Sequence, residues 1–332
     1  MMENIFNNFE RGHVMRKISI IIPTYNEERN IGPLISELQK TFLGINYDLE
    51  CIFVDDGSVD NTLNEIKIQC EIHHNVYLVE LSRNFGKDQA LQAGIEFAEG
   101  DAVITMDADL QHPPELIKEM IKLWEEDYDI VYAFREKANP HAKMLQKISS
   151  RLFYKFINLL SDINMEDGVS DYRLIDKKVI TQLKQIKEYD VFFRGMIKWI
   201  GYKQIGIPFS PAARMSGEAS YSVFKLFKLA LNSTISFSVR PLYAATFLGL
   251  LFSILSLLYI PYILISYFLG YIRISGWASL IATVAFFGGL QLFVLGIIGM
   301  YFGKLFIQTK QRPNYIVRSA NHSHVNNDLT KL

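Results

Sequence analysis

Residues 16–215 alternate between two kinds of segment. Short apolar runs of strand length are separated by segments in which apolar residues recur at helical spacing. The strand-like runs are 18–22, 49–54, 76–81, 102–106 and 130–134, and the helix-like segments between them are 31–42, 61–72, 89–98 and 115–124. Strands that alternate with helices predict an α/β domain, in which a mostly parallel sheet is covered by helices on both faces.

The C-terminal part has a different pattern. Residues 242–272 and 274–303 contain no Asp, Glu, Lys or Arg. A membrane-spanning helix needs roughly 20 mostly apolar residues, so we predict two spans, at about 243–268 and 277–302 within 241–303. Pro261 is expected to kink the first span. The glycines of the second span would allow close helix packing, including self-association into a homo-oligomer.

The segment that precedes these runs, 216–240, is amphipathic. Phe224, Phe227, Leu231 and Ile235 recur at helical spacing. We expect a helix that lies in the membrane interface. An ordinary surface helix of a soluble domain is the alternative.

Charge is distributed unevenly along the chain. Residues 1–193 carry 21 Lys and Arg against 33 Asp and Glu, whereas 194–332 carry 13 against 2. A basic region beside apolar helices suits an anionic membrane surface. The formal net charge of −1 gives no preference for nucleic acid. Because positive residues flank the outer ends of both runs, the positive-inside rule places both termini, including a basic tail at 304–332, in the cytoplasm.

Two minor features complete the outline of the chain. Residues 1–15 are polar and are expected to form a flexible N-terminal extension before the α/β domain. Cys51 and Cys70 are the two cysteines. They do not form a disulfide framework, so a reducing compartment is expected.

Polar motifs follow three of the predicted strands. They are Pro23 to Glu27, Asp55 to Ser58, and Asp107-Ala108-Asp109. Ligands of open α/β sheets bind at the carboxyl ends of the strands, so these motifs are expected to meet at one edge. Two carboxylates one residue apart can hold Mg²⁺ or Mn²⁺, with substrate phosphates completing the ligand shell. The alternative for Asp107 and Asp109 is a solvated loop.

Five short motifs together resemble a known family. They read IPTYNEE (22–28), VDDGS (54–58), NFGK (84–87), MDADLQ (106–111) and SDYRL (170–174). The chain resembles the inverting glycosyltransferases of family 2, which have the GT-A fold, and among them the polyprenyl-phosphate glycosyltransferases. These include dolichol-phosphate mannosyltransferases and bactoprenol glucosyltransferases. The bacterial branch also has two C-terminal spans followed by Lys-x-Arg-Pro, here 310–313, and the resemblance covers about 16–318.

The resemblance implies roles for particular residues. It implies Asp171 as the catalytic base, Asp109 as a second catalytic residue, and Arg214, after a further predicted strand at 203–207, as a ligand of the acceptor phosphate. A divalent cation would be held by Asp107, Asp109 and Gln111. The residues expected to bind the nucleotide sugar are Pro23, Tyr25, Glu27, Asp55, Asp56, Lys87, Asp107, Ala108, Gln111 and Arg135.

Chemistry modifies one of these roles. The implied acceptor is a phosphate monoester, whose second pKa is about 6. It is largely dianionic at neutral pH and needs little deprotonation. We therefore expect Asp171 to orient the acceptor or take a residual proton, rather than to be indispensable for forming the nucleophile.

Several residues also have a purely structural explanation. Asp171 could pair with nearby Arg173, Gln111 could cap the following helix, and Tyr25 could simply pack. Arg135 and Arg214 could be solvated charges, and His112 is expected to be a loop residue rather than a metal ligand.

The chain departs from the family pattern at two places. Where the family often has Gly-Glu-Ser-Lys-Tyr, residues 217–221 read Gly-Glu-Ala-Ser-Tyr, without the lysine. Met300 stands where many bacterial relatives have Glu. The first departure affects the loop expected to bind the acceptor, and the second only the membrane part.

The function predicted is the inverting transfer of one hexose, with UDP-glucose as the first candidate donor, to undecaprenyl phosphate. It would take place at the cytoplasmic face of the bacterial inner membrane, in a multi-pass protein. A processive polysaccharide synthase is one alternative, but residues 193–199 lack the Gln-x-x-Arg-Trp pattern of those enzymes. A non-catalytic scaffold that binds nucleotide sugars is another.

Overall fold

The computed structural model describes residues 15–135, 168–189, 192–210, 235, 238–269 and 276–322. The chain divides into two compact units, one of 1–147, 166–220 and 313–332, the other of 148–165 and 221–312. We call them the sheet unit and the helical unit. The predicted extension up to residue 14, nearly all of the amphipathic segment 216–240, and Arg214 lie outside the described residues.

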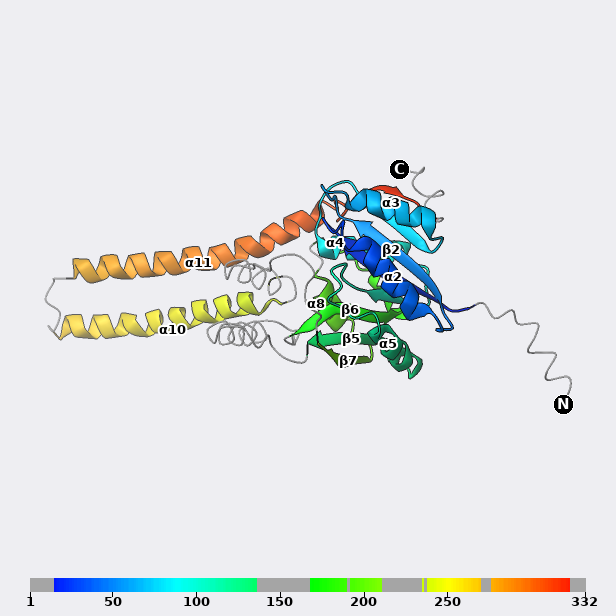
Figure 1. The fold of residues 1–332 in the computed structure, drawn as a ribbon. Helices are drawn as coiled ribbons and strands as arrows, with labels where there is room; N and C mark the ends of the chain where they lie inside the picture. The colour runs from blue at the N-terminus through cyan, green and yellow to red at the C-terminus, as the bar shows by residue number, and fades with distance from the viewer. Residues whose placement is uncertain are drawn as a thin grey trace. The chain divides into compact units, whose positions relative to one another are not determined.

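The sheet unit is built on an eight-stranded sheet (Figure 1). Its strands are β1 (Lys17–Thr24), β2 (Asp48–Asp55), β3 (Val76–Leu81), β4 (Ala102–Thr105), β5 (Ile130–Arg135), β6 (Val169–Asp176), β7 (Gln204–Phe209) and β8 (Val317–Ala320). They lie in the order β7-β5-β6-β4-β1-β2-β3-β8. The β1–β2, β1–β4, β2–β3 and β5–β7 pairs are parallel, while β6 and β8 run antiparallel to their neighbours. The predicted mostly parallel α/β sheet is confirmed.

Helices cover both faces of this sheet. They are α2 (Ile31–Phe42), α3 (Thr62–Ile72), α4 (Lys87–Phe97), α5 (Leu116–Glu125), α7 (Lys177–Leu183) and α8 (Phe193–Trp199). Buried residues of α2, α3 and α5 share one core with Ile18, Ile20 and Ile22 of β1. Ile21 points to the opposite face, where α4 contacts β1 and β2. All four isoleucines are fully buried, because a central parallel strand is covered on both sides.

Two strands were not predicted from the sequence. β6 carries the polar residues Ser170, Asp171 and Arg173 within a buried strand, and it is inserted between β4 and β5. β8 lies in the region expected to be a basic tail and adds an edge strand to β3. It is held there by Arg318 and Ser319, which bind the Glu80 carboxylate at 2.9 and 2.8 Å.

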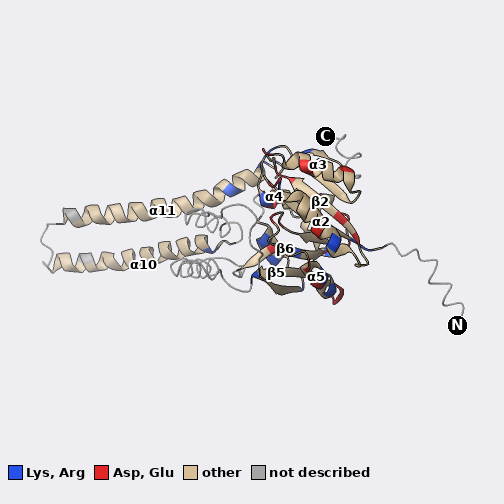
Figure 2. Cartoon of the chain, viewed as in Figure 1, with Lys and Arg blue, Asp and Glu red and all other residues tan. Residues whose placement is uncertain are grey.

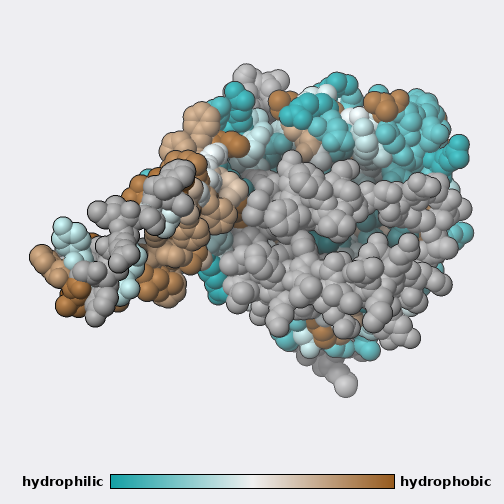
Figure 3. All heavy atoms as spheres, turned by 90° about the vertical axis from the view of Figure 1, so that its left-hand side faces the viewer, coloured by the Kyte–Doolittle hydropathy of each residue, from teal (hydrophilic) through white to brown (hydrophobic). Residues whose placement is uncertain are grey.

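The helical unit contains two long helices, α10 (Arg240–Phe268) and α11 (Trp277–Thr309), which run side by side in Figure 1. Both are long and apolar enough to cross a membrane. Charged residues are nearly absent along them (Figure 2), and their surface is largely apolar (Figure 3). Their large side chains are exposed, with Phe247 at 66% and Leu292 at 70%. Pro261 lies inside α10, which continues past it.

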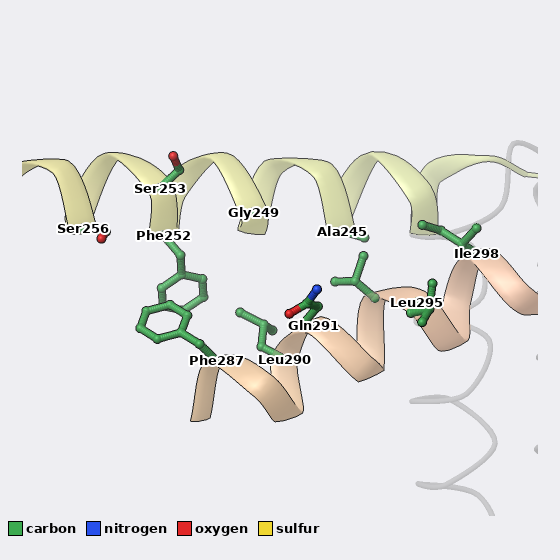
Figure 4. A pocket seen from close by; sticks show the side chains of 11 residues that line it. Ala245, Gly249, Phe252, Ser253, Ser256, Phe287, Leu290, Gln291, Leu295 and Ile298 are labelled. Atoms are coloured by element: carbon green, nitrogen blue, oxygen red, sulfur yellow. The ribbon is translucent and has the colours of Figure 1, made fainter. Parts of the chain in front are cut away.

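A pocket of about 580 Å³ lies between α10 and α11. The rings of Phe252 and Phe287 face each other between the helices, with centroids 5.8 Å apart, and Gln291 contributes a polar side chain to the lining of the pocket (Figure 4). Ala245 and Gly249 leave space on the α10 side. Small residues at such an interface let helices approach closely.

Candidate active site

The three polar motifs meet at one edge of the sheet. β4, β1 and β2 are adjacent and parallel, and Thr24 at the end of β1 is in register with Asp55 at the end of β2. Thr105, at the end of β4, is in register with Ile21. The loops that follow these strands therefore open on the same side, as expected for a ligand site of an α/β sheet.

Asp55 and Asp56 have different surroundings. Asp56 is 3% exposed, and its two carboxylate oxygens accept hydrogen bonds from the backbone N–H groups of Phe85 and Gly86, at 2.7 and 2.9 Å. It therefore braces the loop that leads to Lys87. Asp55 accepts a hydrogen bond from the Ser58 N–H at 3.3 Å, and its Oδ1 has no hydrogen-bond partner among the described residues. Asp55 thus keeps one buried carboxylate oxygen that no described residue binds, on a side chain that is 1% exposed.

The loop after β1 is fastened to the loop after β2. Asn26 has a positive φ of 58°, and its side-chain oxygen accepts a hydrogen bond from the Val59 N–H at 2.9 Å. The Glu27 N–H donates to the Thr62 hydroxyl at 2.7 Å. These contacts leave Tyr25 45% exposed, so its ring is accessible for stacking on a flat ligand. The sequence analysis did not single out Asn26, which holds this loop in place.

The Asp-Ala-Asp segment lies on a buried support. The Asp107 N–H donates to His112 Nδ1 at 3.2 Å, so the neutral ring carries its proton on Nε2 and donates it to the Ser170 hydroxyl at 2.6 Å. The ring also stacks on Tyr172, with centroids 4.9 Å apart. Burial lowers the pKa of His112. Both ring nitrogens are therefore engaged, and His112 positions the motif without a nitrogen available for a metal.

Asp109 and Gln111 form the rest of this segment. Asp109 Oδ1 accepts a hydrogen bond from the Gln111 N–H at 3.2 Å, and Leu110 between them has a φ of 58°. Gln111 Oε1 accepts a long hydrogen bond, 3.4 Å, from Arg135. Gln111 does not cap the following helix, because α5 begins at Leu116. Its buried amide nitrogen has no hydrogen-bond partner among the described residues.

These residues fit a hard divalent cation. Asp107 and Asp109 would supply carboxylate oxygens and Gln111 an amide oxygen, which are the donor atoms that Mg²⁺ and Mn²⁺ prefer. Asp107 already attracts a cation, because the Lys87 ammonium forms an ion pair with it. The electrostatics of this edge therefore favour positive charge beside Asp107.

Asp171 lies between two cations. Arg194 Nε donates to its Oδ1 at 2.6 Å and Arg194 Nη2 to its Oδ2 at 2.8 Å, while Lys87 Nζ lies 2.9 Å from Oδ2. Burial alone would raise the pKa of Asp171, but the hydrogen bonds from Arg194 and the charge of Lys87 hold it well below its usual range. The two cations thus favour the ionised form of Asp171.

Arg194 is not among the site residues that the sequence predicts. It comes from the short helix α8, 23 positions after Asp171, and no local spacing connects the two. The expected alternative pairing of Asp171 with Arg173 is replaced by this contact. Arg173 is buried and donates instead to the backbone oxygen of Ser170 at 3.2 Å.

The sequence matches known proteins over this whole region. Residues 19–183 match the model of Glycosyl transferase family 2. The chain belongs to this family, and it is a glycosyltransferase. It is 40% identical over 302 residues to an uncharacterized glycosyltransferase of Synechocystis, covering 91% of this chain and 94% of that protein.

Two further relatives carry more specific names. The SfII prophage-derived bactoprenol glucosyl transferase of Shigella flexneri is 34% identical over 93% of this chain and 99% of its own length. The prophage bactoprenol glucosyl transferase homolog of Escherichia coli is 33% identical over 91% of this chain and 98% of its own length. The similarity therefore extends beyond the family 2 region into the two long helices.

Proposed function

We propose that this glycosyltransferase transfers a single hexose from a nucleotide sugar to a polyprenyl phosphate, with UDP-glucose and undecaprenyl phosphate as the first candidates. The observation that carries the proposal is the contact of Lys87 with both Asp107 and Asp171. Through Lys87, the carboxylates suited to a metal-bound diphosphate, Asp107 and Asp109, lie next to a cluster of cations suited to a phosphate acceptor. The relatives named bactoprenol glucosyl transferases support the same reaction.

The donor would bind at the edge formed by the loops that follow β1, β2 and β4. Tyr25 offers an exposed ring to the nucleotide base, and Asp55 offers a carboxylate oxygen to the ribose. Glu27 lies in the same loop as Tyr25, and Pro23 lies near the end of β1 just before it. Gln111, Ala108 and Arg135 would flank the diphosphate. A divalent cation on Asp107 and Asp109 would neutralise charge that develops on the leaving diphosphate.

The acceptor provides the nucleophile without help from a strong base. An oxygen of its phosphate forms the bond to the sugar C1 while the bond from C1 to the nucleoside diphosphate breaks, and the electron pair leaves with the diphosphate. Attack from the opposite side inverts the configuration at C1. A dianionic phosphate, with a second pKa of about 6, releases no proton in this step. Asp171, held ionised by its neighbours, orients Lys87 and Arg194, the cations that would receive the acceptor phosphate.

The apolar helices of the helical unit support a membrane location. α10 and α11 would span the bacterial inner membrane, with both termini and the catalytic domain at 16–215 in the cytoplasm. Residues 216–240 would lie along the anionic membrane surface, and Arg214 would contact the acceptor phosphate. A lipid acceptor anchored in the membrane would then supply its phosphate to the catalytic domain.

A donor screen tests the proposal. Purified full-length protein in detergent receives undecaprenyl phosphate, Mn²⁺ or Mg²⁺, and radiolabelled UDP-glucose, UDP-N-acetylglucosamine or GDP-mannose. We expect one labelled lipid, lost with EDTA and with Asp109→Ala but retained with Asp48→Ala, an exposed carboxylate at the opposite end of β2. Label in a long polymer would instead support the processive synthase, and no labelled lipid from any donor would contradict the proposal.

A further inference from the structure

Lys87 and Arg194 present positive charge at the surface in front of a buried carboxylate. The Asp171 side chain is 6% exposed, whereas those of Lys87 and Arg194 are 41% and 46% exposed. The three residues come from β6, α4 and α8, which are separate in sequence. In an ion pair buried inside a fold, neither cation would be accessible to a ligand. Here both cations are accessible, and only the carboxylate is buried.

Both cations keep donors that Asp171 does not use. Of the five N–H donors of a guanidinium, the hydrogen bonds of Arg194 to Asp171 take two. The ammonium of Lys87 has three N–H donors, of which its contacts with Asp107 and Asp171 take two. The carboxylate thus fixes the position of two cations whose remaining donors suit the oxygens of a phosphate.

We propose that Lys87 and Arg194 form the subsite for the phosphate monoester of the acceptor, and that Asp171 is the buried counter-ion that positions both. This inference rests on the proposed function, whose acceptor it places. Lys87 also contacts Asp107, so the acceptor phosphate would lie next to the carboxylates that face the donor diphosphate. Direct displacement at the sugar requires this proximity.

The two cations offset the charge of the carboxylates beside them. Lys87 and Arg194 contribute two positive charges against the negative charges of Asp171 and Asp107. Without them, a phosphate dianion next to a buried carboxylate would be strongly repelled. Arg194 can also bind two phosphate oxygens at once, because its planar fork matches their geometry, which a lysine cannot do.

The competing explanation is a structural ion pair that ties α8 to β6. It predicts that loss of Arg194 lowers stability and affects every ligand alike. The phosphate subsite predicts a selective loss of phosphate-bearing ligands. Binding measurements with matched ligands separate these two explanations.

Equilibrium binding to the full-length protein in detergent provides the test, with farnesyl phosphate, farnesol and inorganic phosphate as probes. We expect Arg194→Met and Lys87→Met each to lower the affinity for farnesyl phosphate by at least about tenfold. The affinity for farnesol should stay within about twofold of the wild-type value. Weak binding of inorganic phosphate should be lost in the same variants. Lys178→Met, which removes another half-exposed lysine paired with an aspartate, Asp129, is the control and should bind all three probes as the wild type does.

Two further measurements keep the result decisive. Thermal unfolding and UDP binding show whether Arg194→Met retains its fold and donor site. If Arg194→Met does not fold, Arg194→Lys replaces it. This variant keeps the positive charge but loses the planar guanidinium, and it should still bind farnesyl phosphate more weakly than the wild type. Two results would overturn the subsite. One is unchanged binding of farnesyl phosphate in the folded Arg194 variants. The other is a wild-type protein that binds farnesol and farnesyl phosphate with equal affinity. If the donor screen succeeded, the proposed function would remain.

Discussion

Arg194 binds both carboxylate oxygens of Asp171, at 2.6 and 2.8 Å, from a helix that follows the Asp171 strand in sequence. This contact changes the role expected of Asp171. A general base is most effective when its pKa lies near the working pH, whereas Arg194 and Lys87 hold the pKa of Asp171 well below its usual range. The residue acts through the cations that it positions.

The pH dependence of the reaction should therefore reflect the acceptor and not Asp171. We predict that kcat/KM for the acceptor falls on the acid side near pH 6, where the phosphate monoester takes up its second proton. Asp171→Asn should lower kcat/KM by less than about 100-fold, the lower end of what a general base supplies, and should leave the acid limb in place. A variant that is inactive at every pH, or an acid limb that disappears in it, would contradict the positioning role.

Asp88 should make the protein less stable as the pH rises. Burial, together with the charge of Asp171, raises the pKa of Asp88 to about 6. A carboxyl whose pKa is raised on folding contributes stability that is fully present below its unfolded pKa, about 3.9, and is lost as the pH rises through the folded value. We expect a loss on the order of 1 kcal/mol between pH 5 and pH 8.

Chemical denaturation at the two pH values checks this expectation. Asp88→Asn should lose less stability than the wild type over the interval. Asp48→Asn, at an exposed position, should follow the wild type. Parallel curves for wild type and Asp88→Asn would show that Asp88 titrates normally.

Gly57 should tolerate no side chain. It has a φ of +70°, and a Cβ there would lie 2.6 Å from the backbone carbon of Arg83 and 2.7 Å from the backbone nitrogen of Asn84. Gly57→Ala must therefore displace the Asn84 to Lys87 loop that Asp56 braces. We predict a loss of about 2 kcal/mol or more in unfolding free energy, together with weaker UDP binding.

Gly44→Ala is the matched control for that substitution. Gly44 also has a positive φ, +86°, but a Cβ there would have no atom within 4 Å. It should cost only the conformational penalty, about 1 kcal/mol, and leave UDP binding unchanged. Equal losses in the two variants would argue against the steric explanation.

His322 should fasten the C-terminal strand to the sheet. Its ring is buried against Tyr77, with centroids 4.4 Å apart, and its Nε2 lies 3.1 Å from Glu50 Oε1. Burial would raise the pKa of Glu50, but hydrogen bonds from His322, Ser19 and the Glu99 N–H outweigh it and lower the pKa. The stability from Glu50 is thus present above its unfolded pKa, about 4.3, and is lost as the pH falls through the lower folded value.

Removing His322 should move acid unfolding to higher pH. We predict that His322→Ala loses about 2 kcal/mol at neutral pH and unfolds in acid earlier than the wild type, because Glu50 keeps its burial but loses a partner. Acid titration followed by circular dichroism measures both effects. His74→Ala, at an exposed position, should match the wild type, and an unshifted His322→Ala curve would contradict the anchoring role.

Sequence patterns reveal most of the sheet because its central strands are apolar without interruption. β1 to β5 were all recognised, with boundaries that differ by at most two residues from the observed ones. β6 escaped recognition because Ser170, Asp171 and Arg173 break its apolar pattern. β8 escaped because an edge strand of four residues, Val317–Ala320, carries almost no periodic signal.

The candidate site was partly predictable for a similar reason. Asp107 and Asp109 follow a strand directly, so local sequence places them at the sheet edge. The partners of Asp171 depend on how α4 and α8 meet β6, which no short motif encodes. Asn26 acts through a hydrogen bond from the backbone of Val59, and His112 through a hydrogen bond to Ser170 in the buried strand β6. Both partners are distant in sequence, so only the fold shows these contacts.

The most direct test of the central claim is the structure of the reaction product. Mass spectrometry and proton NMR of the lipid formed from undecaprenyl phosphate and UDP-glucose, or the donor that the screen selects, give the number of sugars and the anomeric configuration. We predict one hexose joined through C1 to the lipid phosphate, with the configuration opposite to that in the donor. A ladder of sugars, retained configuration, or a sugar attached elsewhere would contradict inverting transfer of a single hexose to the acceptor phosphate.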